Sequence, residues 1–228
     1  KGNRQVDAAG YRHTFNDSFC CLEQLLPQLS TLQQIIYTGS CSIYGDANGD
    51  WINESTAAAA RDEHGAVLLE AERQLLAMAG QQRRVCILRL AALYGPQRDF
   101  EQRFERLAGS TQPGRDDRFT NWIHRDDAAA AVVAALDGHW SGIINVVDDA
   151  PVPLAELLNA SLAHAGLEPI TWQRSSQPSK PGLNRRISNR LLKDRGFQLK
   201  HPSIALLSEG SAPQREPAST AERTSPQR

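Results

Sequence analysis

The 228-residue chain carries 25 lysines and arginines against 26 aspartates and glutamates, and 40% of its residues are hydrophobic. Its net charge of −1 gives no electrostatic reason to expect binding to nucleic acid or to an anionic membrane. No apolar run approaches the ~20 residues that a membrane-spanning helix needs, and the amino terminus lacks the apolar core of a signal peptide. Length and composition therefore predict one domain with a substantial buried core, plus appendages.

The first predicted elements are a helix and a strand. Residues 1–15 are polar and show no clear period. One of residues 16–18 is expected to cap a helix that carries an apolar stripe and is disturbed at its end by Pro27. The apolar run at 35–37 predicts a buried strand, which stops at Gly39 and a cluster of hydroxyl side chains.

Strands and helices alternate along the rest of the chain. We expect a loop at 46–62 and a charged helix and loop at 97–118. Other patterns predict helices at 63–79, 128–136, 153–164 and 188–195, and strands at 84–90, 143–147 and 170–172. This alternation is typical of βαβ units and predicts an α/β fold with a parallel sheet in residues 1–207. Residues 208–228 have no large apolar side chain and are expected to form a disordered tail.

The cysteines indicate the redox compartment. Cys20 and Cys21 are adjacent, while Cys41 and Cys86 stand alone, so the four form neither a C-x-x-C motif nor a disulfide framework. We expect reduced thiols and a cytoplasmic protein.

Ser40 is the first candidate site residue because it follows the strand at 35–39. Ligands of open α/β sheets lie outside the carboxyl ends of the strands, so Ser40 would stand at the edge of a ligand. The alternative is that Thr38, Ser40 and Ser42 only satisfy local backbone groups after a strand. A serine hydrolase is rejected, because no G-x-S-x-G pentapeptide is present.

Five segments in order support a family resemblance. They are 37–46 (YTGSCSIYGD), 69–72 (LEAE), 88–96 (LRLAALYGP), 123–127 (IHRDD) and 186–197 (RISNRLLKDRGF). Together they resemble the NAD(P)-dependent epimerase/dehydratase family, the extended or atypical short-chain dehydrogenases. The resemblance implies a Rossmann-like parallel sheet with a small carboxyl-terminal segment on the substrate side. It also implies oxidation and reduction of a sugar-nucleotide-like substrate, with NAD or NADP as cofactor.

Site residues follow from the same resemblance. Ser40 corresponds to the catalytic serine or threonine of the family. Thr38, Gly39 and the segment Leu90, Ala91 and Ala92 correspond to its cofactor side. Arg185 and Arg186 correspond to its substrate side and would face an anionic substrate, the alternative being a solvated basic helix start.

Two departures from the family pattern limit the expected chemistry. The chain has no glycine-rich G-x-x-G-x-x-G turn, which in such proteins lets a helix start hold the dinucleotide pyrophosphate. We therefore expect an amino-terminally truncated domain whose cofactor half is missing, so that this chain alone binds no dinucleotide. When residues 69–72 are aligned with the matching helix segment of the family, His64 and Leu68 fall at the positions of the tyrosine and the lysine of Tyr-x-x-x-Lys. His64 is then a candidate acid or base, or simply a histidine exposed at a helix entry.

His124, Asp126 and Asp127 are candidate metal ligands by residue type. An aspartate capping the following helix explains the pattern more simply, so no metal is expected. Two functional hypotheses remain. The first is an atypical epimerase/dehydratase-like oxidoreductase that is impaired here and takes a small-molecule substrate. The second is a non-catalytic binding or interaction module on the same scaffold. Neither involves nucleic acid or a membrane, and the sequence leaves homodimer formation open.

Overall fold

The centre of the molecule is a three-stranded parallel sheet. The structure is a computed structural model that describes residues 7–96, 104–113, 117–173 and 183–204. The strands are β1 (Gln34–Ser40), β3 (Arg84–Leu90) and β8 (Gly142–Val146), in the order β1-β3-β8. Both pairings are parallel. This confirms the predicted α/β fold, and all three strands were expected from their apolar runs.

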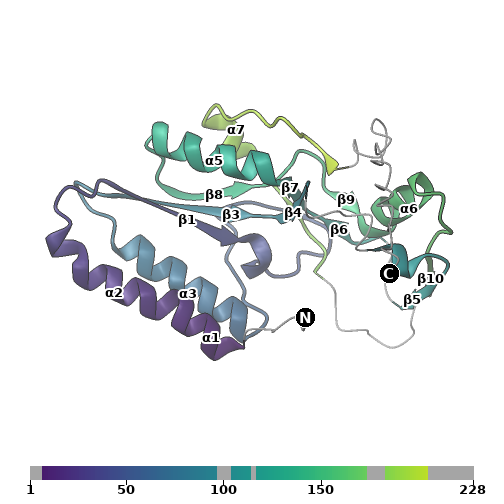
Figure 1. The fold of residues 1–228 in the computed structure, drawn as a ribbon, viewed down its shortest axis with the longest axis horizontal. Helices are drawn as coiled ribbons and strands as arrows, with labels where there is room; N and C mark the ends of the chain where they lie inside the picture. The colour runs from purple at the N-terminus through teal and green to yellow at the C-terminus, as the bar shows by residue number, and fades with distance from the viewer. Residues whose placement is uncertain (1–6, 97–103, 114–116, 174–182, 205–228) are drawn as a thin grey trace, which may run out of the picture.

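Helices cover both faces of this sheet (Figure 1). On one face lie α1 (Ala8–Arg12), the π-helix η1 (His13–Asp17), α2 (Ser18–Leu25) and α3 (Glu63–Ala77). On the other lie α5 (Arg125–Asp137) and α7 (Arg190–Asp194). The result is a three-layer arrangement in which the sheet is buried between two sets of helices.

Strand β3 contributes apolar side chains to both faces of the sheet and so holds the helices of each face against it. Val85 and Ile87 pack toward α3 with Leu75 and Met78. The intervening Cys86 and Leu88 pack toward α5, whose alanines at 128, 131 and 135 are small enough to let the helix lie close to the sheet. Alternation along a strand thus supplies an apolar core on both faces.

Strand β1 lies at one edge of the described sheet. It pairs with β3 along one side, and the described residues place no strand along its other side. Its side chains are mostly half-buried, whereas five consecutive residues of β3 are buried.

The helical run before β1 begins earlier than predicted. The sequence indicated no structure before residue 16, but Asp7 caps α1 by accepting a hydrogen bond from Gly10 N at 2.8 Å. Ser18 begins α2 without a capping bond from Asp17, because the chain enters α2 directly from η1. The short 3-10 helix η2 (Leu26–Gln28) contains Pro27 and ends the run, as predicted.

Four small two-stranded pairings extend the fold beyond the main sheet. Two lie next to it: β2 (Trp51–Ile52) with β11 (Arg186–Ile187), and β4 (Ala92–Tyr94) with β7 (Trp122–His124). The others are β6 (Phe119–Thr120) with β9 (Val152–Pro153), and β5 (Thr111–Pro113) with β10 (Thr171–Gln173). The sequence predicted loops at β2 and β5, so both strands correct that prediction. Two-residue and three-residue strands are too short to show a period.

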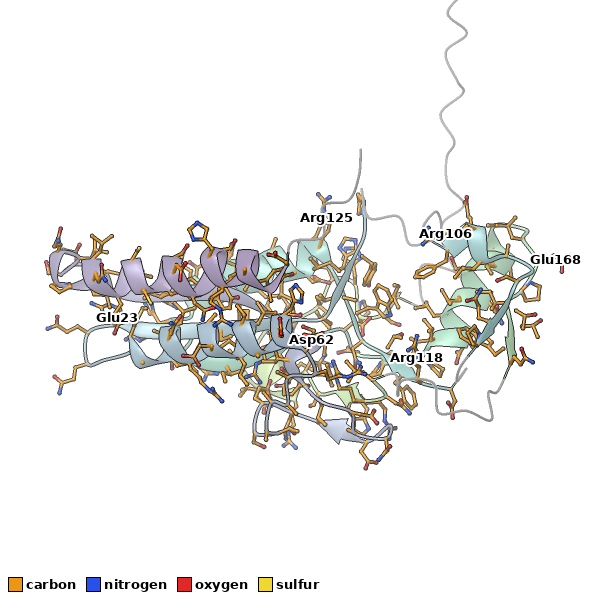
Figure 2. The ribbon with its side chains drawn as sticks, turned by 90° about the horizontal axis from the view of Figure 1, so that it is seen from below. Glu23, Asp62, Arg106, Arg118, Arg125 and Glu168 are labelled. Carbon is orange, nitrogen blue, oxygen red and sulfur yellow. The ribbon has the colours of Figure 1, made fainter. Side chains whose placement is uncertain are left out.

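A small lobe stands beside the sheet layers. It contains α6 (Leu154–His164), the 3-10 helix η4 (Glu105–Leu107) and the β5/β10 pair. Figure 2 shows Arg106 and Glu168 on this lobe and Arg118 on the connection toward it. The expected tail at 208–228 lies outside the described residues. Within the described part, no helix is long and apolar enough to cross a bilayer.

Candidate functional site

The carboxyl ends of the parallel strands open onto a cavity. Ser40, Leu90 and Val146 form the last paired row of β1, β3 and β8. Ser40 and Leu90 line a cavity of about 340 Å³, together with Ala91, Ala92 and the segment Phe119–Trp122. Ligands of open α/β sheets lie at such strand ends. Ser40 therefore lines a cavity, and its position at the edge of a ligand stays a prediction.

The Ser40 hydroxyl also has a local partner. Its Oγ accepts a hydrogen bond from Ser42 N at 3.1 Å and lies 2.9 Å from Ser42 Oγ. Ser40 thereby caps the 3-10 helix η3 (Cys41–Ile43), as the local alternative in the sequence predicted. The Ser40 O–H donates to Ser42 Oγ, so it could donate to a ligand in the cavity only by rotating away from Ser42. The catalytic role of Ser40 stays a prediction.

Arg185 is the charged side chain on the cavity wall. It is 6% exposed, and it donates to Cys41 O at 2.9 Å and to Gly45 O at 3.2 Å. No carboxylate of the described residues lies within 4.0 Å of its guanidinium, and its Nε is buried without a hydrogen-bond partner. Burial lowers the pKa of Arg185, because a low-dielectric environment disfavours the charged form. The charge of Asp46 compensates part of this burial from beyond ion-pair distance, and an anion bound in the cavity would stabilise the guanidinium further.

Asparagines hold the cavity wall in place, and the sequence reasoning missed them. Asn121 donates to Arg185 O at 3.0 Å and accepts from Ile187 N at 2.8 Å. Asn184 N donates to Asp46 Oδ1 at 2.7 Å, and Asn184 Oδ1 accepts from Phe119 N at 2.9 Å. These amides join segments that are more than 60 residues apart. An isolated asparagine in a loop gives no local pattern from which this role can be predicted.

A buried ion pair supports the sheet below Ser40. Glu72 of α3 accepts from Arg89 of β3 at 2.7, 3.2 and 3.2 Å, and both side chains are almost fully buried. Gly39, the register neighbour of Arg89, leaves room for this contact. A Cβ on Gly39 would lie 2.9 Å from Glu72 Oε1. The glycine before the hydroxyl cluster therefore lets the carboxylate approach the strand.

The ion pair continues into a polar chain across the sheet. The Arg89 guanidinium lies 4.8 Å from the centre of the Tyr44 ring, and Tyr44 donates to Asn145 Oδ1 at 2.9 Å. Asn145 is paired in register with Arg89, and its backbone N–H donates to Glu54 Oε1 at 2.8 Å. These polar contacts fix the loop that follows Ser40, because Tyr44 is part of that loop.

His64 lies apart from the cavity wall. It is in the first turn of α3, capped by Asp62, which Figure 2 labels at the start of that helix. The His64 ring is half-buried and makes an edge contact with Tyr11 at 4.6 Å between ring centres. Leu68, one turn later, is also half-buried. Neither residue is among those lining the cavity, and a leucine side chain cannot donate a hydrogen bond.

Of the remaining predicted residues, Thr38 and Gly39 lie within β1 before the cavity, while Arg186 lies outside its lining. Cys41 lines the cavity, but its Sγ donates to Arg89 O at 3.2 Å and burial raises its pKa to about 12. Its thiol is therefore protonated at neutral pH, and it is not an activated nucleophile.

The capping prediction at 124–127 was wrong. His124, rather than an aspartate, caps α5 by accepting from Asp126 N at Nδ1, at 3.2 Å. Asp127 is buried and instead accepts from Lys200 N and His201 N at 2.9 and 2.8 Å. Sequence pattern cannot show that a distant segment takes the carboxylate.

His124, Asp126 and His201 lie close enough to be considered as metal ligands. However, the rings of His124 and His201 stack at 3.7 Å, with 27° between their planes. Stacked rings do not direct their nitrogen lone pairs at a common point, and His124 Nδ1 already accepts the capping hydrogen bond. To bind a tetrahedral metal ion, the two rings would have to unstack and His124 Nδ1 would have to give up its capping hydrogen bond.

The dinucleotide that the resemblance implies does not fit the described residues. The sequence has no glycine-rich turn for a pyrophosphate, and Leu68 stands where a ribose-binding lysine would be needed. Ser40 and the segment Leu90–Ala92, which the resemblance places beside the cofactor and the reacting atoms, line the cavity, and their role toward a dinucleotide stays a prediction.

Comparisons with known proteins place this geometry in context. The family model described as "NAD dependent epimerase/dehydratase family" matches residues 22–146. Protein YeeZ of Escherichia coli K12 is 32% identical over 174 residues, which cover 75% of this chain and 60% of YeeZ. The chain therefore spans less than two thirds of that curated relative.

Two solved structures share the fold. A dTDP-glucose 4,6-dehydratase from Bacillus anthracis, in complex with NAD, has a TM-score of 0.73 at 16% identity and covers 90% of this chain and 69% of its own. A UDP-N-acetylglucosamine 4-epimerase from Methanobrevibacter ruminantium, in complex with UDP-N-acetylmuramic acid, has a TM-score of 0.73 at 14% identity, covering 91% and 71%. At these identities the likeness concerns the fold alone.

Proposed function

The chain belongs to the NAD-dependent epimerase/dehydratase family, and we propose that it is an atypical oxidoreductase-like protein that binds sugar-nucleotide-like compounds. The observation that carries this proposal is the cavity at the carboxyl ends of β1 and β3. It joins Ser40, a hydrogen-bonding group, with Arg185, a buried cation. Both solved relatives described above act on nucleotide sugars according to their names, which supports the proposed substrate class.

The roles of the chain's own residues follow from their chemistry. Arg185 attracts an anionic group, since binding would neutralise a cation that is buried without an ion pair. Ser40 donates a hydrogen bond to a ligand oxygen once its O–H turns from Ser42 Oγ to the cavity, while its own oxygen still accepts from Ser42 N. Leu90 and Ala91 provide the apolar wall beside them and exclude water. In a cofactor-loaded protein the dinucleotide would supply the redox chemistry, and no step of that chemistry is assigned to this chain.

A second function, a non-catalytic binding module, is favoured by one observation. Aligning residues 69–72 with the family puts Leu68 at the position of the lysine and His64 at that of the tyrosine. The His64 ring packs against Tyr11 and is not among the residues that line the cavity. Under this alternative the same cavity binds a ligand without turning it over. Both functions therefore require the cavity to bind an anionic sugar compound.

Calorimetric titration of the chain with UDP-glucose tests this requirement. A charge-assisted hydrogen bond is worth about 1.5–3 kcal/mol, so Arg185→Gln should weaken binding by roughly 10- to 100-fold. Arg185→Lys keeps the charge but loses the planar fork that holds Cys41 O and Gly45 O, so it should retain part of the affinity. Circular dichroism would verify that both variants fold. Equal affinity in wild type and Arg185→Gln would contradict the assignment.

A further inference from the structure

A surface of stacked side chains leads out of the cavity. The Arg186 guanidinium lies 4.9 Å from the centre of the Phe119 ring and 5.3 Å from the centre of the Trp51 ring. Phe119 belongs to the cavity lining, whereas the Trp51 side is open to solvent. We call these three residues the ring platform. In it Arg186 lies between Phe119 of the cavity wall and the exposed Trp51.

The ring platform is held rigidly. Trp51 and Arg186 are register partners in the β2/β11 pair, where Arg186 N donates to Asp50 O at 3.0 Å and Ser188 N to Ile52 O at 2.9 Å. Arg186 Nε also donates to Gly49 O at 2.7 Å. The guanidinium plane is therefore fixed by backbone, and a ligand that stacks here does not have to order it first.

Trp51 is exposed enough for a ligand to contact its ring. Its side chain is 54% exposed, whereas Trp122 and Trp140 are 6% and 4% exposed. An exposed indole backed by an arginine is suited to a second planar ring, because aromatic and guanidinium faces both stack on nucleobases. A sugar ring has no π-face and would contact the indole only through its C–H groups.

The volume of the cavity indicates which part of a sugar nucleotide it can hold and which part lies outside it. About 340 Å³ lies near the lower end of the roughly 300–1,000 Å³ typical of ligand cavities, so it suits a sugar-sized group rather than a whole sugar nucleotide. The rest of such a ligand has to leave the cavity. The ring platform begins at Phe119 in the cavity wall and carries the positive charge of Arg186.

We infer that the outer face of Trp51 is a nucleobase subsite, on which the base of a sugar nucleotide stacks while its sugar occupies the cavity. This inference rests on the proposed function. Arg186 lies between the two ends, where its charge complements the ligand's phosphates. Trp51 thus sets the preference for nucleotide-linked over free sugar compounds.

Tryptophan fluorescence and calorimetry with UDP, UDP-glucose and glucose 1-phosphate test the subsite. UDP and UDP-glucose should quench the emission of the wild-type chain and protect it from acrylamide, since Trp51 is far more exposed than Trp122 and Trp140. Trp51→Ala should weaken UDP-glucose binding by roughly 5- to 100-fold, the range expected for loss of one base stack. Trp51→Phe should retain most of the affinity, and glucose 1-phosphate should bind all three chains alike.

A matched control is Trp172→Phe, which changes a half-buried tryptophan of β10 that packs with the small-lobe cluster around Leu158. It should leave both the UDP-induced quenching and the affinity unchanged. Equal UDP-glucose affinity in wild type and Trp51→Ala would overturn the subsite while leaving the proposed function standing, provided that Arg185→Gln still weakens binding. No binding of UDP-glucose to the wild-type chain would overturn both.

Discussion

The buried pair of Glu72 and Arg89 provides the sharpest prediction about stability. Glu72→Ala removes three N–H···O contacts of 2.7–3.2 Å and leaves the Arg89 guanidinium with a 4% exposed side chain and no carboxylate. Breaking a buried pair on one side typically costs about 3–5 kcal/mol, because the remaining charge stays desolvated. The contact with the Tyr44 ring persists and offsets only part of this cost.

The same helix supplies the control for this experiment. Glu70 and Arg73 form an exposed pair at 3.4 Å, and pairs of this kind contribute about 0–1 kcal/mol. Urea denaturation followed by circular dichroism should therefore give Glu70→Ala a free energy of unfolding near that of wild type. The double variant Glu72→Leu with Arg89→Met should be more stable than Glu72→Ala, because it leaves no unpaired charge. If Glu72→Ala costs no more than Glu70→Ala, the ion pair does not support the sheet as argued.

Three further predictions test the same core and its loops. Gly39→Ala should lower the melting temperature, because overpacking costs about 1–3 kcal/mol and the new Cβ meets Glu72; Gly80→Ala, with no atom within 4 Å, should not. Burial raises the pKa of Asp148 to about 7, so its charged form is disfavoured in the folded chain and the free energy of unfolding should fall as pH rises from about 4 to about 7. In Asp148→Asn the free energy of unfolding should not show this fall. Identical pH dependence of unfolding in the variant and the wild type would refute the prediction. In the folded chain, an aromatic disulfide reagent at pH 8 should label exposed Cys20 and Cys21, while rapid reaction of buried Cys41 or Cys86 would contradict their environments.

Local patterns were sufficient to predict the sheet. The β-branched and apolar run of β3 agrees with its observed bounds, since a strand buried on both faces needs apolar side chains at successive positions. The position of Ser40 followed from the same logic, because a strand end in a parallel sheet faces the ligand crevice. Gly166 and Gly196 adopt positive φ angles just after α6 and α7, as expected for glycines that end helices.

Tertiary contacts decided what local patterns could not. Asp126 or Asp127 was expected to cap α5, but His124 is the cap, and the backbone N–H groups of residues 200 and 201 donate to both oxygens of Asp127. The ring platform depends on a register between β2 and β11, whose two-residue strands carry no period of their own. The role of His64 stays a prediction from alignment, since the described geometry places its ring against Tyr11.

The central claim is that this chain provides a substrate cavity without a dinucleotide site, and parallel calorimetric titrations with UDP-glucose, NAD and NADP test it most directly. The account predicts saturable binding of UDP-glucose that Arg185→Gln weakens. It predicts no binding of either dinucleotide below the millimolar range, because the pyrophosphate cradle and the ribose-binding lysine are not supplied by this sequence. Micromolar binding of NAD or NADP, or the absence of UDP-glucose binding, would contradict it.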